Sequence, residues 1–287
     1  MTTIVPAIFI TSIVIAWLIT FFVAIKGHLG NKVGFGGGLA VGIVSGFITS
    51  SIYFLAGGLG IPLIVAIEIL VIIFVGASGI LFFFYRDPKR TPPAKEGIIV
   101  SPADGFVRYV RHFERGRIPE AVKGKSNISI KEIAKTDFTE NDGYIIGITM
   151  RILDVHVNRA PISGKVVFQK HTTGKFMSLK SAESDTLNER NTIIIDSGLF
   201  KVCVVQIASR MIRKIVSYIS EGEDIKIGQR IGMIKFGSQA DLIIPDIQGL
   251  KITVKEGELV YSGKSIIAEY SSNNVGSNNG ITSVKSP

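Results

Sequence analysis

The chain has 287 residues, a net charge of +9 and a mean hydropathy of +0.39, and 46% of its residues are hydrophobic. So high a hydropathy points to membrane insertion rather than to a water-soluble protein. The single cysteine, Cys203, excludes an internal disulfide framework and a cysteine-based zinc site, and no metal site is predicted. A net positive charge is compatible with nucleic-acid binding, but helix-turn-helix, zinc-finger and RNA-binding signatures are missing from the sequence. No nucleic-acid partner is therefore predicted.

Three apolar stretches, at residues 4–25, 35–58 and 61–85, predict two or three transmembrane helices in a membrane region that covers residues 1–85. Each stretch approaches or exceeds the ~20 residues that cross about 30 Å of hydrocarbon. The middle stretch is rich in glycine, which suits close packing between helices.

Residues 1–85 contain three charged side chains, those of Lys26, Lys32 and Glu68, and carry a net charge of +1. The rest of the chain therefore carries a net charge of +8. Glu68 is costly in lipid and is expected to face a neighbouring helix or to reach toward the interface. The cationic residues that flank the stretches are Lys26, Lys32, Arg86, Lys89 and Arg90. The positive-inside rule then predicts a cell-membrane protein whose following domain lies on the cytoplasmic side, where its charge attracts anionic headgroups.

Residues 86–270 predict a mainly β, barrel-like domain. Short β-branched runs recur there and are separated by Gly, Asp, Asn and Pro. The connector RDPKRTPPAKEG, residues 86–97, is expected to be extended. The segments EGEDIKIGQRIG and KEGELVYSGKSI resemble the glycine-cornered strands of lipoyl or biotinyl modules, so a hybrid-like barrel is predicted. Residues 271–287 are predicted to be a disordered tail.

Three short motifs carry candidate catalytic groups. Asp104 lies in SPADG, in a turn before a strand. His156 lies in MRILDVHVNRAP, where strand alternation would put it on one face with Asp154 and Asn158. The pair Gly237-Ser238 is expected in a tight turn or at a strand end. Taken separately, the SPADG segment and the Gly-Ser pair are explained as ordinary turns, and the polar residues around His156 are explained as a solvated strand edge. Together they supply an acid, an imidazole and a hydroxyl, the parts of an activated nucleophile.

In combination with their neighbours these motifs resemble the phosphatidylserine decarboxylases, in the short form found in archaea and many bacteria. The resemblance covers most of residues 82–245, in order, and follows apolar stretches that also fit the family. The matching segments are YRDPKRTPP, IVSPADG, MRILDVHVNRAPISGKV, NERN and IGMIKFGSQADLIIP.

The resemblance implies a zymogen of phospholipid synthesis that makes its own cofactor. The Ser238 hydroxyl would attack the Gly237 carbonyl, the chain would break between these residues, and residue 238 would become a pyruvoyl group. A β chain of residues 1–237 and an α chain would stay together as a heterodimer, with further dimerisation left open. The pyruvoyl ketone would form a Schiff base with the serine amine of phosphatidylserine or archaetidylserine, and loss of CO₂ would give the ethanolamine lipid.

The resemblance also assigns roles to individual residues. Asp104 would support self-cleavage, and His156 is the candidate acid that protonates the substrate carbon. Arg159 stands where long-form enzymes carry a second histidine that is assigned to self-cleavage, and arginine will not act as a general base at neutral pH. Either Asp104 with His156 suffices for the cut, or another group such as His171 takes part.

A noncatalytic membrane-tethered carrier or adaptor, similar to lipoyl and biotinyl domains, is the alternative function. A carrier presents a lysine at the tip of a hairpin. The corresponding place in this chain holds FGSQ, and Lys235 precedes it in an apolar run.

Overall fold

The computed structural model describes residues 4–26, 29–115, 117–118, 128–135, 138, 141–174, 188–208, 214–235 and 238–271. Residues 272–287, all but the first residue of the predicted tail, lie outside the described residues. The chain divides into two compact units, Met1–Arg86 with Arg151–Leu153, and Asp87–Met150 with Asp154–Pro287.

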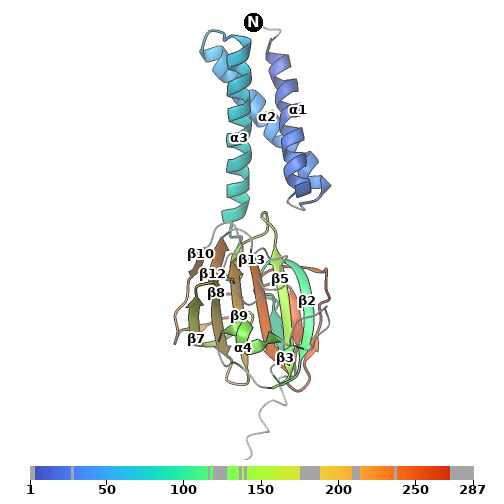
Figure 1. Ribbon diagram of the computed structural model, residues 1–287, viewed down its shortest axis with the longest axis vertical. Helices are drawn as coiled ribbons and strands as arrows, with labels where there is room; N and C mark the ends of the chain where they lie inside the picture. The colour runs from blue at the N-terminus through green and yellow to red at the C-terminus, as the bar shows by residue number, and fades with distance from the viewer. Residues whose placement is uncertain are drawn as a thin grey trace, which may run out of the picture. The chain divides into compact units, whose positions relative to one another are not determined.

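Three helices make up most of the first unit: α1 (Ile4–Lys26), α2 (Asn31–Leu55) and α3 (Ile61–Tyr85) (Figure 1). Each is long and apolar enough to cross a membrane. Apolar side chains such as Phe22 and Phe74 are exposed on their outer faces, as expected for helices in contact with lipid. Three apolar helices therefore precede the β domain, as the sequence predicts. α2 begins before the apolar stretch and includes Lys32 in its first turn.

Small residues let α1 and α2 pack closely. Gly34, Gly38, Gly42 and Gly46 follow one another at intervals of one helical turn on the buried face of α2. A Cβ atom on Gly42 would lie 2.6 Å from the Cα atom of Ile13. At this point the two backbones touch without space for a side chain.

Glu68 is buried between the helices, as one of the two sequence alternatives predicts. It is 2% exposed, and its Oε1 atom accepts hydrogen bonds of 2.6 Å from the hydroxyls of Thr11 and Ser12 on α1. A polar side chain in a membrane helix needs such partners, because lipid offers none.

The second unit is built from antiparallel sheets, and its large sheet is curled into a half-barrel (Figure 1). Eight strands form the large sheet in the order β11-β7-β8-β9-β13-β5-β2-β15, and two three-stranded sheets have the orders β10-β12-β6 and β1-β16-β14. A pair, β3-β4, completes the set. The strands are β1 (Ile98–Val100), β2 (Gly105–Phe113), β3 (Arg117–Ile118), β4 (Ile128–Ser129), β5 (Gly143–Met150), β6 (Val157–Arg159), β7 (Gly164–Thr172), β8 (Arg190–Asp196), β9 (Lys201–Ala208), β10 (Lys214–Ser217), β11 (Asp224–Ile225), β12 (Arg230–Lys235), β13 (Ser238–Pro245), β14 (Lys251–Ile252), β15 (Leu259–Val260) and β16 (Ile266–Glu269).

Apolar side chains cover both faces of the large sheet. The main core lies on one face and includes Ile148, Val204 and Leu242 from three adjacent strands. A smaller core on the other face includes Cys203, which is buried, and lies beneath the short helix α4 (Ile130–Ala134). Burial on both faces explains why the central strands read as continuous apolar runs rather than as alternating ones.

The β-rich, barrel-like fold class predicted from the sequence is confirmed. The β-branched runs of the sequence coincide with the longer strands, and the connector after α3 has no regular structure. The strands that the sequence analysis did not identify are β3 and β4, which have two residues each. Strands this short contain too few residues to show an alternating pattern.

We expect Gly42→Leu to destabilise the packing of α1 against α2, because the added side chain meets backbone atoms of Ile13. Overpacking of this kind costs about 1–3 kcal/mol. Gly36→Leu is the matched control, since a Cβ atom at Gly36 has nothing within 4 Å. Thermal unfolding in detergent, followed by circular dichroism at the helix band, should show a lower midpoint for Gly42→Leu only; equal midpoints would contradict this packing.

Candidate active site

The bond between residues 237 and 238 lies where the chain passes from one sheet to another. β12 ends at Lys235 in a three-stranded sheet, and β13 begins at Ser238 in the middle of the large sheet. The backbone of Ser238 is in register with Met150 on β5 and with Ala208 on β9. Gly237 lies outside the described residues. The serine is therefore at a strand end, one of the two places that the sequence allows.

His156 lies beside the strand that leads to this bond. It directly precedes β6, and its carbonyl oxygen accepts a hydrogen bond of 3.3 Å from the backbone N–H of Ile234 on β12. The expected alternation with Asp154 along a strand is wrong, because residues 152–154 form a turn and the strand begins only at Val157. The turn nevertheless keeps both side chains buried.

The imidazole of His156 is held as a neutral base. Its Nδ1 atom lies 2.8 Å from the carbonyl oxygen of Asp154, and because a carbonyl can only accept, Nδ1 carries the proton and Nε2 is the acceptor. Burial lowers the pKa of His156 from 6.5 to about 4, although the charges of Asp154 and Asp104 act in the opposite direction. At neutral pH Nε2 is thus free of a proton.

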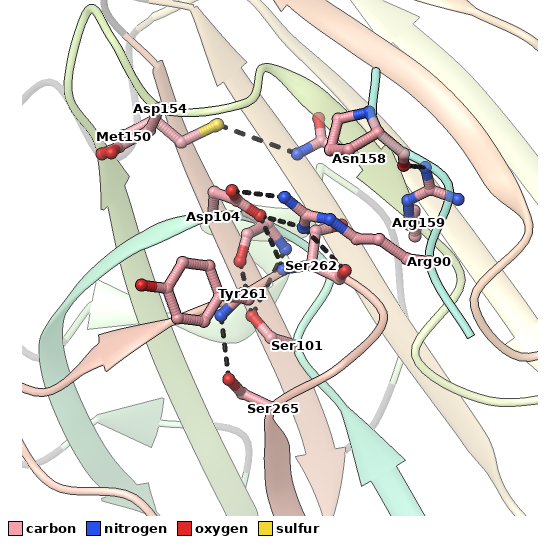
Figure 2. Close-up of polar contacts among 12 residues, drawn as sticks. Arg90, Ser101, Asp104, Met150, Asp154, Asn158, Arg159, Tyr261, Ser262 and Ser265 are labelled. Carbon is pink, nitrogen blue, oxygen red and sulfur yellow. Dashed lines mark hydrogen bonds and ion pairs between the residues drawn. The ribbon is translucent and has the colours of Figure 1, made fainter. Parts of the chain in front are cut away.

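Asp104 is held as a buried carboxylate in the turn before β2. Arg90 forms a two-pronged ion pair with it, through Nη1 to Oδ1 and through Nη2 to Oδ2 at 2.7 Å (Figure 2). The backbone N–H of Ser262 donates a further hydrogen bond of 2.7 Å to Oδ1. Three donors for one carboxylate fix its position, and its charge reaches His156 through space.

Arg159, which stands in the place of a second histidine, makes contacts that hold separate segments of the domain together. Its guanidinium donates to Asp87 Oδ1 over 2.6 Å and to the carbonyl oxygens of Gly228 and Pro88 over 3.0 and 3.2 Å. A Cβ atom on Gly263 would lie 2.9 Å from its Cδ atom. Arg159 thus joins β6 to the connector and to two turns.

His171 lies elsewhere in the sheet. Its Nε2 atom is 3.1 Å from Glu189 Oε1, and its side chain is 45% exposed. The ladder runs from His171 through Asn191 and Gln206 to Ala240 on β13. Three strand spacings amount to about 14 Å. The structure brings Asp104 and His156 into electrostatic range of each other, whereas His171 lies three strands away from β13.

A polar network that the sequence reading missed follows the serine on β13. Gln239 accepts a hydrogen bond of 2.5 Å from Arg108 Nη1, and its amide donates to Asp241 Oδ1 over 2.7 Å and to the Tyr109 hydroxyl over 3.1 Å. Gln239 and Asp241 are both fully buried. The only signal in the sequence is the polar pair at alternate positions of QADLIIP. The network fixes the start of β13 immediately after Ser238.

Comparisons with known proteins agree on one family. A family model described as phosphatidylserine decarboxylase matches residues 79–268. A protein of Methanocaldococcus jannaschii, provisionally named an archaetidylserine decarboxylase proenzyme, is 46% identical over 65% of this chain and 87% of its own length. A Methanothermobacter thermautotrophicus protein with the same provisional name is 36% identical over 76% and 92%. The phosphatidylserine decarboxylase proenzyme of Xanthobacter autotrophicus is 32% identical over 74% and 86%.

We expect His156 to make the folded protein sensitive to acid. Because its pKa is lowered in the folded state, the unfolded chain binds a proton first, so stability is lost as pH falls from 6.5 toward 4. The loss attributable to this residue is about 3 kcal/mol. Chemical unfolding in detergent at several pH values should show a shallower acid dependence for His156→Gln than for the unaltered chain, and parallel curves would contradict the assignment.

Proposed function

From the premise that the chain belongs to the phosphatidylserine decarboxylase family, and is a carboxy-lyase of phospholipid synthesis made as a proenzyme, we propose that it cuts itself between Gly237 and Ser238. Residue 238 then carries the pyruvoyl group on which decarboxylation depends. The observation that supports this most directly is the position of a buried, neutral His156 beside β12, the strand that leads to this bond.

In the first step the Ser238 hydroxyl attacks the carbonyl carbon of Gly237, and an ester replaces the amide. A base must take the hydroxyl proton. Nε2 of His156 suits this role, because the backbone carbonyl oxygen of Asp154 keeps the proton on Nδ1 and burial keeps Nε2 unprotonated. Elimination then breaks the ester bond and leaves a carboxylate on Gly237. Hydrolysis of the resulting dehydroalanine releases ammonia and gives the pyruvoyl group.

Asp104 supports the base through its charge. Its two oxygens are held by Arg90 and by the backbone of Ser262, so its position is fixed. When His156 takes up a proton, the negative charge of Asp104 stabilises the imidazolium. We assign no proton transfer to Arg159, whose guanidinium is engaged with Asp87 and two carbonyl oxygens.

The pyruvoyl group supplies an electron-accepting carbonyl for the loss of CO₂. The substrate ammonium must lose a proton before its nitrogen can act as a nucleophile, and Nε2 of His156 can take that proton. After CO₂ has left, the same imidazole can return a proton to the substrate carbon. A pKa of about 4 makes the imidazolium a strong acid, which favours this return.

The substrate we propose is a serine phospholipid, either phosphatidylserine or archaetidylserine. The two lipids share the headgroup on which the reaction takes place and differ in their tails. Three membrane-length helices hold the enzyme at the lipid surface, and the flanking lysines and arginines favour a catalytic domain on the cytoplasmic side. The cut would leave a large chain of residues 1–237 and a small chain of residues 238–287 in one folded unit.

The carrier alternative is set aside. The chain belongs to a family of decarboxylases. Moreover, the place where a carrier would present its lysine is a crossover between two sheets, not the tip of a hairpin.

We expect the denatured protein to give two chains in intact mass spectrometry, separated between Gly237 and Ser238. The small chain should be about 17 Da lighter than one with a free N-terminal serine, because ammonia is lost. Ser238→Ala should remain one chain and release no CO₂ from vesicles that contain the serine lipid. A single uncut wild-type chain, or a small chain with a serine amine, would refute the proposed cofactor.

We expect His156→Ala to lower the rate of self-cleavage by about 100-fold or more, the typical contribution of a general base. His171→Ala should cleave at nearly the wild-type rate, since its imidazole pairs with Glu189 away from the site. Pulse labelling followed by gel electrophoresis measures both rates. Normal cleavage in His156→Ala with loss of decarboxylation would restrict His156 to the second reaction, and slow cleavage in His171→Ala would reverse the assignment.

A further inference from the structure

Three buried side-chain amides are joined in a row by hydrogen bonds. Asn191 Nδ2 donates to Gln206 Oε1 over 2.8 Å, and Gln206 Nε2 donates to Asn158 Oδ1 over 2.8 Å. The last member lies 3.9 Å from the sulfur of Met150 (Figure 2). All three amides are at most 2% exposed. We call these three residues, Asn191, Gln206 and Asn158, the amide chain.

The amide chain connects strands of two different sheets. Asn191 and Gln206 lie on β8 and β9 of the large sheet, and Asn158 lies on β6 of the small one. Gly232 on β12 makes room for it, since a Cβ atom there would lie 2.9 Å from Gln206 Nε2. The Gln206 side chain thus links β9 to β6, and the absence of a side chain at Gly232 leaves space for its amide.

Both ends of this link are close in sequence to the proposed machinery. Gln206 precedes by two residues Ala208, which pairs with Ser238. Asn158 follows His156 by two residues and is in register with Gly232 on β12. The hydrogen bond between Gln206 and Asn158 therefore joins the strand beside the serine to the strand that follows the histidine.

Stability alone does not account for the amides. A buried amide must be fully paired to avoid a cost, and an apolar core of equal shape can be as stable. A hydrogen bond differs from an apolar contact in that it fixes distance and direction. Such precision matters at a reacting centre, where a displacement of about 1 Å can cost 100-fold in rate.

We propose that Gln206 is a positioning residue for self-cleavage and decarboxylation. Its amide fixes β6 against β9 and thereby sets the position of His156 relative to the first residue of β13. This proposal rests on the proposed function. The proposal also assigns a role to the segment NERN, because its last residue, Asn191, orients the Gln206 amide by donating a hydrogen bond to Oε1.

The test is Gln206→Met, which keeps the length and shape of the side chain and removes both hydrogen bonds. Gln169→Met is the matched control, because Gln169 also links the large sheet to the small one, but through Ser217 on β10, two strands away from β6. We expect the half-time of self-cleavage to rise at least tenfold in Gln206→Met and to stay within twofold of wild type in Gln169→Met. Both variants should keep the circular dichroism spectrum of the folded protein.

The fraction of Gln206→Met that has been cut provides a second readout. With serine lipid in vesicles, kcat per cut chain should fall at least tenfold while KM changes by less than twofold, because Gln206 lies in the core and is fully buried. A purely structural role would lower the amount of folded enzyme and leave kcat per cut chain unchanged. That result would overturn the proposal.

Outcomes for the two proposals are separable. An uncut wild-type chain counts against the proposed function, whereas a wild type that is cut and a Gln206→Met variant that is cut equally fast count against the positioning role alone. If Gln206→Met does not fold, Asn191→Leu removes only the outer donor and decides the question by the same half-time and kcat measurements. A slower cut in folded Asn191→Leu supports the amide chain, and a wild-type rate overturns it.

Discussion

The bond that we propose to break joins two strands that are held by different partners. β12 is paired with β6 and β10, whereas β13 is paired with β5 and β9. Each strand therefore keeps its own ladder whether or not the peptide between them is intact. The reactive peptide therefore lies between two strands that are each held in place. His156 is next to one of them, because its carbonyl oxygen accepts a hydrogen bond from the backbone of β12.

Three ion pairs join residues of the connector after α3 to Asp104, Arg159 and Arg230. Arg90 binds Asp104, and Asp87 binds Arg159 as well as Arg230. Removing one member of a buried pair leaves an uncompensated charge, which is costly, so these residues are tied to one another. An arginine at position 159 fits this scheme because its fork of donors reaches a carboxylate and two carbonyl oxygens together, which an imidazole cannot do.

The sequence predicts the helices, the longer strands and the motifs of the site, because these follow from apolar length, local periodicity and a recognisable set of residues. It does not predict the partners of Asp104 or Arg159, because these contacts join separate segments, 14 residues apart for Arg90 and Asp104 and 72 for Asp87 and Arg159, and they follow only from the fold. The strand assignment at His156 failed because a turn with buried polar residues shows the same alternation as a strand edge. The contacts of Gln239 and the role of Gln206 were not predicted, since an isolated glutamine shows no sequence pattern from which its neighbours in the fold can be inferred.

The small chain that would result from the cut does not lie on the surface of the large one. It contributes β13 to the middle of the large sheet, β15 to the edge beside β2, and β16 between β1 and β14. Separation would have to open backbone ladders on both sides of β13, so the two pieces are expected to stay together kinetically. Once unfolded, they would need a bimolecular encounter to regain the structure, at a rate that depends on concentration. The precursor is thus the only form that folds as a single chain, and maturation makes that folding a one-time event.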